Sequence, residues 1–156
     1  QYVNFSPESK ASKLALSIVS EDTSDIDALQ AIYNYVISHV TYDYELAESV
    51  DSDYLPDVDQ TLETGKGICF DYAALTAAML RSRDIPCKLQ IGYAGTVKHA
   101  WISIYIRSRG WVDKAVEFSG DSWSRMDPTF DSNSKEDASI RQYIGDDENY
   151  TVQFTR

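Results

Sequence analysis

Long hydrophobic runs and an excess of positive charge are both missing from this sequence. No apolar stretch approaches the roughly 20 residues that a membrane-spanning helix needs, so we expect no membrane insertion. The chain has 14 lysines and arginines against 25 aspartates and glutamates, which gives a formal net charge of −11. Nucleic acids and anionic membrane surfaces are therefore excluded as expected partners, because binding to phosphate needs a basic surface.

Cysteine and histidine are scarce, with two residues of each in the chain. Their positions show neither CxxC nor HxxxH spacing, so we expect no zinc site, and we expect no other metal or cofactor. Cys69 and Cys87 allow one disulfide in an oxidising compartment or two free thiols in a reducing one, and the count alone does not decide. Because Cys87 follows Pro86 at the start of a predicted strand, it is interpreted as a small buried thiol.

The length and composition are those of one globular domain. Single domains span roughly 100–200 residues, so the 156 residues are assigned to one domain over 1–156. Hydrophobic residues make up 43% and charged residues 25%, which excludes a disordered or fibrous chain. The chain opens at Gln1 without Met or a signal-like apolar core, so we expect that a signal was removed or the chain was trimmed. A polar surface and eleven tyrosines are compatible with an extracytoplasmic location.

Helical patterns dominate the first half of the sequence. Apolar residues recur at helical spacing from Ser24 to about Ser38, behind a Ser24/Asp27 pair that resembles a capping box. A shorter helix is predicted to begin behind Pro7. Residues 69–83 are rich in Ala and Leu and end in arginines, which predicts a third helix. No charged residue interrupts its middle, so we expect it to be the buried centre of the domain.

Residues 43–63 carry many carboxylates around Pro56. This composition favours an exposed acidic loop over a regular element. A calcium site is disfavoured, because the stretch DSDYLP has Leu and Pro where a calcium loop needs a ligand and a glycine. The acidic segment also suits a lid or a docking surface for a basic partner, which high salt would weaken.

The pattern changes to that of β-strands after Pro86. The stretches CKLQIGYAG and HAWISIYI alternate between the two faces of a strand. Four apolar residues share one face of the second strand, and they are Ala100, Ile102, Ile104 and Ile106. Two further strands are expected at 111–118 and 123–127, joined by the turn SGDS. Helices followed by antiparallel strands predict an α+β domain, with the helices on one face of a small sheet.

Cys69 stands behind two glycines, Gly65 and Gly67, where the third helix begins. Cysteine attacks only as the thiolate, and the partial positive charge of a helix N-terminus lowers the pKa of a thiol. The glycines let the backbone approach a substrate, and the amide of Cys69 is placed to donate to an oxyanion. This pattern predicts a nucleophile.

A thiolate needs a proton partner, and the candidates are His39 and His99. His39 lies near a helix end, where a polar surface role is expected. His99 leads one face of a strand directly after a glycine-containing turn, which is a rigid place from which to direct an imidazole. Asp127 and Asp113 are both available to orient His99, and Pro128 would hold Asp127 at a strand end.

Three stretches taken together resemble the transglutaminase-like superfamily, whose members share a papain-like core with Cys, His and Asp in that chain order. They are GKGICFDYAALTAAMLRSRDIPCKLQIGY, HAWISIYI and GWVDKAVEFSGDSWSRMDPTF, and they cover about residues 60–131. In that family the Cys follows a glycine at the start of the central helix, the His precedes Ala-Trp, and the Asp precedes Pro-Thr. Carried over by motif, these are Cys69, His99 and Asp127, which decides for Asp127 over Asp113.

The resemblance implies an α+β, papain-like fold in which a Cys-bearing central helix packs on the sheet. It implies that Cys69 attacks an amide carbon of a peptide or protein, that His99 moves the proton and that Asp127 orients His99. The thioester is resolved by water in a peptidase or amidase, or by an amine in a transamidase. The compact chain favours a bacterial-type, single-domain member. The alternative is a catalytically idle peptide- or protein-binding module on the same fold.

The resemblance also implies a side chain upstream of the Cys that completes the oxyanion hole, often an aromatic residue or Gln. Tyr42, Tyr54 and Gln60 are all available, and spacing does not choose among them. Tyr42 is mildly favoured because it follows a predicted helix end. Asp71 lies two residues after Cys69, where its charge suits the helix dipole but opposes a nearby thiolate, so it is interpreted as structural. With Cys69 as nucleophile, we expect no bridge to Cys87.

Overall fold

A computed structural model of the chain describes residues 3–94, 97–119, 122–123 and 150–155. Its helices are α1 (Lys10–Ile18), α2 (Asp25–His39), α3 (Tyr44–Ser49), α4 (Val58–Thr64) and α5 (Cys69–Arg81). Its strands are β1 (Thr41–Tyr42), β2 (Lys66–Gly67), β3 (Cys87–Ala94), β4 (Val97–Ile106), β5 (Gly110–Ser119), β6 (Ser122–Trp123) and β7 (Tyr150–Thr155). Within these ranges, every helix is too short or too polar to cross a membrane.

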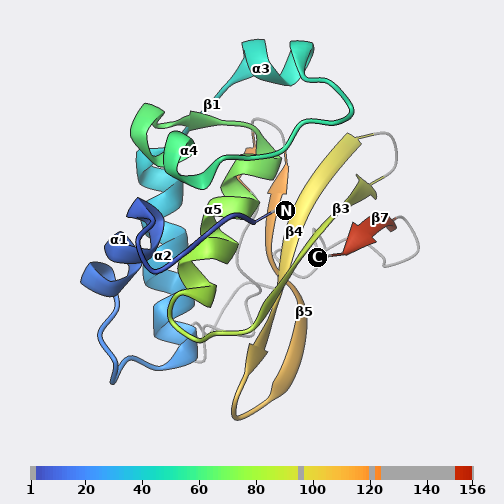
Figure 1. Cartoon of the computed structure of the whole chain (residues 1–156). Helices are drawn as coiled ribbons and strands as arrows, with labels where there is room; N and C mark the ends of the chain where they lie inside the picture. Colours follow the sequence, from blue (N-terminus) through green and yellow to red (C-terminus); the bar gives the residue numbers. More distant parts are fainter. Residues whose placement is uncertain (1–2, 95–96, 120–121, 124–149, 156) are drawn as a thin grey trace.

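The main sheet has five antiparallel strands in the order β6-β5-β4-β3-β7. Helices α1, α2 and α5 lie on one side of it, and α5 is the helix next to the strands (Figure 1). This confirms the predicted α+β architecture with a Cys-bearing helix on a small antiparallel sheet. The sequence patterns did not predict β7 or the short parallel pair formed by β1 and β2. Of the predicted strand 123–127, residues 124–127 lie outside the described residues.

The predicted helices begin and end close to their expected positions. The hydroxyl oxygen of Ser24 accepts from the backbone N–H of Asp27 at 3.2 Å, and the same hydroxyl donates to the Asp27 carboxylate at 2.6 Å. Ser9 caps α1 in the same way, through the N–H of Ser12. These contacts satisfy N–H groups that have no partner within the first turn of a helix. The Ser24/Asp27 signal read in the sequence is therefore the one that starts α2, whereas the Ser9 cap of α1 was not read.

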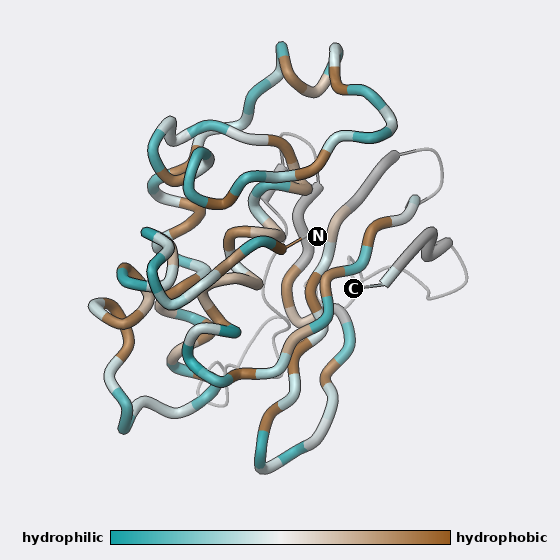
Figure 2. Tube along the Cα trace, viewed as in Figure 1, coloured by the Kyte–Doolittle hydropathy of each residue, from teal (hydrophilic) through white to brown (hydrophobic). Residues whose placement is uncertain are grey.

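The core lies between α5 and the sheet. Every residue of α5 from Cys69 to Leu80 is buried, which confirms the prediction of a central helix. The predicted apolar face of β4 is at most 2% exposed, and it consists of Ala100, Ile102, Ile104 and Ile106. Figure 2 shows hydrophobic stretches along β3 to β5, whereas the turn between β4 and β5 is hydrophilic. Burying each large aliphatic side chain contributes about 1.5–3 kcal/mol, so this layer stabilises the position of α5.

The opposite face of the sheet is also buried over its middle. Trp101 and Ser103 of β4 are 1% and 0% exposed. The indole Nε1 of Trp101 and the hydroxyl of Ser103 both donate to the side-chain oxygen of Gln90, at 3.1 and 2.8 Å. Buried polar groups need such partners, because an unpaired one costs about 1–3 kcal/mol. Both faces of β4 are therefore buried in the middle of the strand, so the alternation in its sequence does not mark an exposed face there.

The prediction of an acidic loop over 43–63 was wrong in part, because the segment contains α3 and α4. The carboxylate of Asp43 accepts the N–H of Leu46 and begins α3, and Asp57 accepts the N–H groups of Asp59 and Gln60 and begins α4. Carboxylates are favoured at helix N-termini by these hydrogen bonds and by the helix dipole. Some of the acidic residues that suggested a loop, such as Asp43 and Asp57, are thus helix caps.

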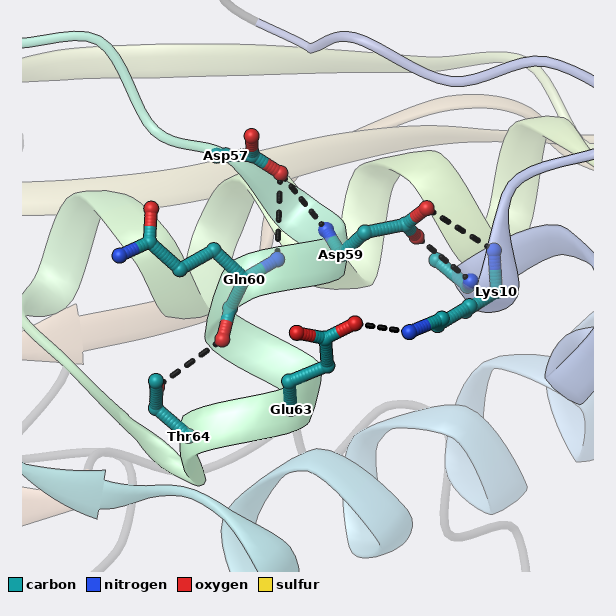
Figure 3. Close-up of polar contacts among 7 residues, drawn as sticks. Lys10, Asp57, Asp59, Gln60, Glu63 and Thr64 are labelled. Carbon is teal, nitrogen blue, oxygen red and sulfur yellow. Dashed lines mark hydrogen bonds and ion pairs between the residues drawn. The ribbon is translucent and has the colours of Figure 1, made fainter.

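Long-range polar contacts attach these short helices to the rest of the domain. The carboxylate of Asp59 in α4 accepts the backbone N–H groups of Lys10 and Ala11, at 3.1 and 3.0 Å, so it caps α1 from another element (Figure 3). The ammonium of Lys10 also pairs with Glu63. At the other end of the helical layer, the Arg107 guanidinium pairs with Asp25 and holds the pKa of that carboxyl below its usual value.

Candidate active site

Cys69 is the first residue of α5, as predicted, and it keeps 7% of its surface exposed. The strand β2 ends at Gly67, so a single residue, Ile68, separates the strand pair from the thiol. The first N–H groups of a helix point out of its end, and this is where an attacking thiolate and a developing oxyanion are stabilised. The fold therefore places the cysteine at the end of its buried central helix.

Asp71 caps the helix that Cys69 begins. One of its carboxylate oxygens accepts the backbone N–H of Ile68 at 2.8 Å, and the other accepts the hydroxyl of Tyr54 at 2.7 Å. The side chain is 1% exposed. Burial raises the pKa of Asp71, whereas the hydrogen bonds from Tyr54 and Ile68 lower it. Its structural role was predicted, but the contact with Tyr54 was not.

A glycine is required at position 67 because the Asp71 side chain leaves no room for a Cβ atom. A Cβ atom at this position would lie 2.6 Å from the Cβ of Asp71 and 3.1 Å from its carboxyl carbon. The backbone of Gly67 does not adopt a positive φ, in contrast to Gly65 and Gly110. The glycine therefore provides room for the Asp71 side chain to fold back over the strand, which links the glycine and the aspartate of the GKGICFD stretch physically.

We expect Gly67→Ala to destabilise the protein by about 1–3 kcal/mol, because overpacking a filled site displaces its neighbours. The displaced neighbour is Asp71, so the alkylation rate of Cys69 should change as well. Denaturant unfolding and iodoacetamide labelling measure the two effects. Gly110→Ala is the matched control, because Gly110 has φ +86° and nothing within 4 Å of an added Cβ. It should cost backbone strain alone and leave Cys69 labelling unchanged. A Gly67→Ala protein with wild-type stability would contradict this packing.

Tyr42 lies beside the strand that leads to the candidate nucleophile. In the parallel β1–β2 pair, Tyr42 is in register with Gly67, and the N–H of Asp43 donates to the carbonyl of Gly67 at 3.0 Å. The Tyr42 ring packs edge-to-face on Tyr44, with centroids 5.0 Å apart. The sequence spacing could not show this register, because β1 and β2 are separated by more than twenty residues. The role of Tyr42 in an oxyanion hole stays a prediction.

The two other oxyanion candidates lie elsewhere. The hydroxyl of Tyr54 is engaged by the carboxylate of Asp71. Gln60 is exposed on α4, where its side chain and that of Asp57 lie on the side of the helix away from Lys10 (Figure 3). Of the three upstream residues named from the sequence, Tyr42 has the backbone that runs alongside Gly67.

His99 lies on β4, the middle strand of the sheet. Its backbone is paired with Gly92 of β3 on one side and with Ser119 of β5 on the other. The side chain of His99 and the whole of Asp127 lie outside what the structure describes, so the Cys-His-Asp arrangement stays a prediction. Asp113, the rival for Asp127, is exposed on β5.

The other histidine and cysteine have the roles that the sequence predicted. His39 is exposed at the end of α2, where its Nδ1 is 2.9 Å from the carbonyl of Tyr35 and its ring stacks on the Tyr35 ring. Cys87 is buried, and its thiol lies 3.6 Å from the carbonyl of Ala77. Burial raises the pKa of the Cys87 thiol, which keeps it protonated and unreactive. The two cysteines do not form a disulfide with each other.

A cavity of about 310 Å³ lies between α3, α4 and β2. Its lining includes the carboxylates of Asp43 and Asp57, the ring of Tyr54 and the side chain of Lys66. Lys66 precedes Cys69 by three residues, and Tyr54 contacts the cap of the same helix. The acidic segment therefore surrounds a hollow next to the backbone that leads to the candidate nucleophile.

Comparisons of sequence identify the family of the chain. The profile of the Transglutaminase-like superfamily matches residues 12–128. The kyphoscoliosis peptidase of Mus musculus is 28% identical over 114 residues, and that of Homo sapiens is 27% identical over 109 residues. These alignments cover 65% and 62% of this chain but 17% and 16% of the relatives. The chain thus spans about a sixth of the length of these curated relatives.

Solved structures share the fold. A protein from Cytophaga hutchinsonii, described as a "putative cysteine protease", superposes with a TM-score of 0.58 at 21% identity, over 94% of this chain and 42% of that one. A "putative protease" from Parabacteroides distasonis gives a TM-score of 0.54 at 16% identity, over 72% of this chain and 24% of that one. Since the superfamily profile covers well over half of the sequence, the chain belongs to the transglutaminase-like superfamily.

Proposed function

We propose that this chain is a cysteine-dependent acyl-transfer enzyme that acts on peptide or side-chain amides through a thioester. The observation that carries the proposal is the position of Cys69 as the first residue of the buried helix α5, directly behind the glycine-bearing strand β2. Membership of the transglutaminase-like superfamily supports the same chemistry. The alternative is a binding module in which this cysteine has no chemical role.

In the proposed reaction, the sulfur of Cys69 attacks the carbonyl carbon of the amide. His99 takes the thiol proton and then delivers it to the departing amine, so the C–N bond breaks as the thioester remains. The amide of Cys69 stabilises the oxygen that becomes negative, and Tyr42 is the proposed second donor. Asp127 accepts from the other ring nitrogen of His99 and keeps the imidazole oriented.

Two features of the backbone support these roles. His99 belongs to a strand that is paired on both sides, so its Cα is held more rigidly than a residue on a loop. Tyr42 belongs to the strand in register with Gly67, two residues ahead of Cys69. The assignment of Asp127 rests on the Asp-Pro-Thr-Phe motif of the family.

The thioester then reacts with water or with an amine. Water releases a carboxylic acid, as in a peptidase or amidase, whereas a primary amine gives a new amide, as in a transamidase. The two outcomes are distinguished by incubating a glutamine-containing peptide with and without a primary amine. Mass spectrometry then measures the masses of the products. A gain of one mass unit identifies hydrolysis of a side-chain amide, and incorporation of the amine identifies transamidation.

The pH dependence of iodoacetamide labelling tests the proposal. We expect Cys69 to be alkylated at pH 6.5 at least about tenfold faster than an unperturbed thiol, because a helix N-terminus and an imidazolium stabilise the thiolate. Cys87 is the internal control, since burial raises the pKa of its thiol. Mass spectrometry reads the two sites separately. If Cys69 reacts no faster than an ordinary thiol, the binding-module alternative replaces the enzyme.

A further inference from the structure

We propose that Tyr54 is a positioning residue for the reaction: through Asp71, its hydroxyl fixes the peptide unit between Ile68 and Cys69, whose amide is the oxyanion donor. This inference rests on the proposed function, because it assigns a purpose to the alignment of that amide. Tyr54 lies in the segment between α3 and α4, and no local pattern in the sequence links it to the nucleophile.

The contacts of Ile68 show how the link is made. Its N–H donates to the Asp71 carboxylate at 2.8 Å, while its carbonyl accepts the N–H groups of Asp71 and Tyr72 at 2.9 and 3.1 Å. Both polar groups of Ile68 are therefore held by the first turn of α5. The amide of Cys69 belongs to the peptide bond that begins at the carbonyl of Ile68, so its direction is set by the same contacts.

The carboxylate of Asp71 depends in turn on Tyr54. One carboxylate oxygen is used by Ile68, and the Tyr54 hydroxyl donates to the other at 2.7 Å. Asp71 is 1% exposed, so a lost donor is not readily replaced by bulk water. Without the hydroxyl, the carboxylate loses the contact that fixes its rotation, and the bond to Ile68 loosens with it.

Tyr54 is suited to act as a permanent donor. Burial and the charge of Asp71 raise the pKa of its hydroxyl well above the ordinary value, with smaller contributions from the carboxylates of Asp43 and Asp57. The hydroxyl therefore stays protonated at any pH at which the enzyme would work. The ring is held edge-to-face against Phe70, with centroids 6.4 Å apart, and it also lines the 310 Å³ cavity. Tyr54 thus lies between that cavity and the start of α5.

Tyr54→Phe tests the inference, because it removes one oxygen and keeps the ring that packs on Phe70. The test compares two reactions of Cys69, each read at that site by mass spectrometry. Acylation by p-nitrophenyl acetate needs both the thiolate and the oxyanion donor, whereas alkylation by iodoacetamide needs only the thiolate. Both rates scale with the fraction of thiolate, so their ratio cancels that fraction and keeps only the weaker dependence of thiolate nucleophilicity on pKa.

We expect the acylation-to-alkylation ratio to fall about tenfold in Tyr54→Phe, which is less than the 10²–10³ lost when a whole oxyanion donor is removed. Tyr105→Phe is the matched control. It makes the same change on β4, where the Tyr105 ring is partly exposed and packs on Trp111. Its ratio should equal that of the wild type. A ratio in Tyr54→Phe within twofold of the wild type would overturn the inference.

Hydrogen exchange at the amide of Ile68, followed by NMR, separates this inference from the proposed function. We expect Tyr54→Phe to speed this exchange about tenfold while distant amides of β3 keep their wild-type rates. If wild-type Cys69 shows only the ratio of an ordinary thiol, the proposed function fails, and the Ile68 amide alone decides whether Tyr54 fixes the turn. Unchanged exchange at Ile68 would overturn the inference whatever the reactivity of Cys69.

A double variant tests the route through Asp71. If Tyr54 acts only by holding that carboxylate, adding Tyr54→Phe to Asp71→Asn should change the ratio by less than twofold beyond Asp71→Asn alone. Two independent losses that multiply would show that Tyr54 acts by another route and would overturn this assignment. The single variant keeps the proposal testable should Asp71→Asn fold poorly.

Discussion

Replacement of Cys69 by Ala is expected to abolish amide turnover, with a loss of about 10⁴-fold or more, and to leave the fold intact. Removal of the nucleophile from a cysteine or serine enzyme removes the covalent step itself, so only background reaction remains. The structural cost should be about 1 kcal/mol, because Cys69 is buried like Cys87, and Ala favours a helix. Turnover assays and thermal unfolding measure the two effects.

Cys87→Ala is the matched control for this result. It removes a sulfur from a buried site beside Ala77, so it should lower the stability by about 1 kcal/mol and keep turnover at the wild-type level. The opposite pattern, with activity lost in Cys87→Ala and kept in Cys69→Ala, would reject the mechanism. A Cys69→Ala protein that unfolds at room temperature would show that the cysteine is required for packing.

The elements that the sequence predicted are those whose stabilising contacts are local. The helix at 24–38 has its capping serine and its apolar spacing within its own residues, and both are observed. The strand that begins near His99 alternates in a way that the buried face of β4 matches. The predicted nucleophile also lies where expected, because a glycine and a helix start adjoin it in the chain.

The elements that were missed depend on distant residues. The helix α4 has seven residues, too few for an apolar repeat, and its carboxylates cap its own first turn and that of α1. The strand β7 pairs with β3 across more than fifty residues of sequence. Neither the capping by Asp59 nor this pairing has a signature in the adjacent sequence, so composition suggested a loop for one, and the other was overlooked.

The contacts of the candidate site are likewise partly local in the sequence and partly long-range. An Asp three positions after the N-cap is a recognised partner for the N-cap amide, so the contact of Asp71 with Ile68 was predictable from spacing. The hydroxyl that holds the other oxygen of Asp71 comes from Tyr54, seventeen residues upstream, and only the fold reveals it. The register of Tyr42 with Gly67 is likewise a tertiary fact. Motifs thus give the proposed reacting groups, whereas the contacts that hold the turn before Cys69 are visible only in the fold.

The second large effect is expected for His99→Ala. If His99 is the proton partner, its loss removes both the imidazolium that stabilises the thiolate and the acid that protonates the leaving amine. Turnover should fall about 10³–10⁴-fold. General acid–base catalysis alone typically contributes about 10²–10⁴-fold to the rate of such a reaction. Alkylation of Cys69 at pH 6.5 should also slow by about tenfold or more, because the thiolate then forms nearer the ordinary thiol pKa of about 8.5. Labelling rates between pH 5 and pH 9 measure this shift.

His39→Ala is the matched control for His99→Ala. It removes the other imidazole of the chain, from the exposed end of α2, so it should leave both turnover and labelling unchanged. If His99→Ala slows turnover but leaves the labelling profile unchanged, His99 acts as an acid for the leaving group and does not stabilise the thiolate. In that case the helix N-terminus alone activates Cys69, and the alignment of its first turn by Asp71 becomes the main device of the site. If neither turnover nor labelling changes, a histidine does not serve Cys69 and the proposed mechanism fails.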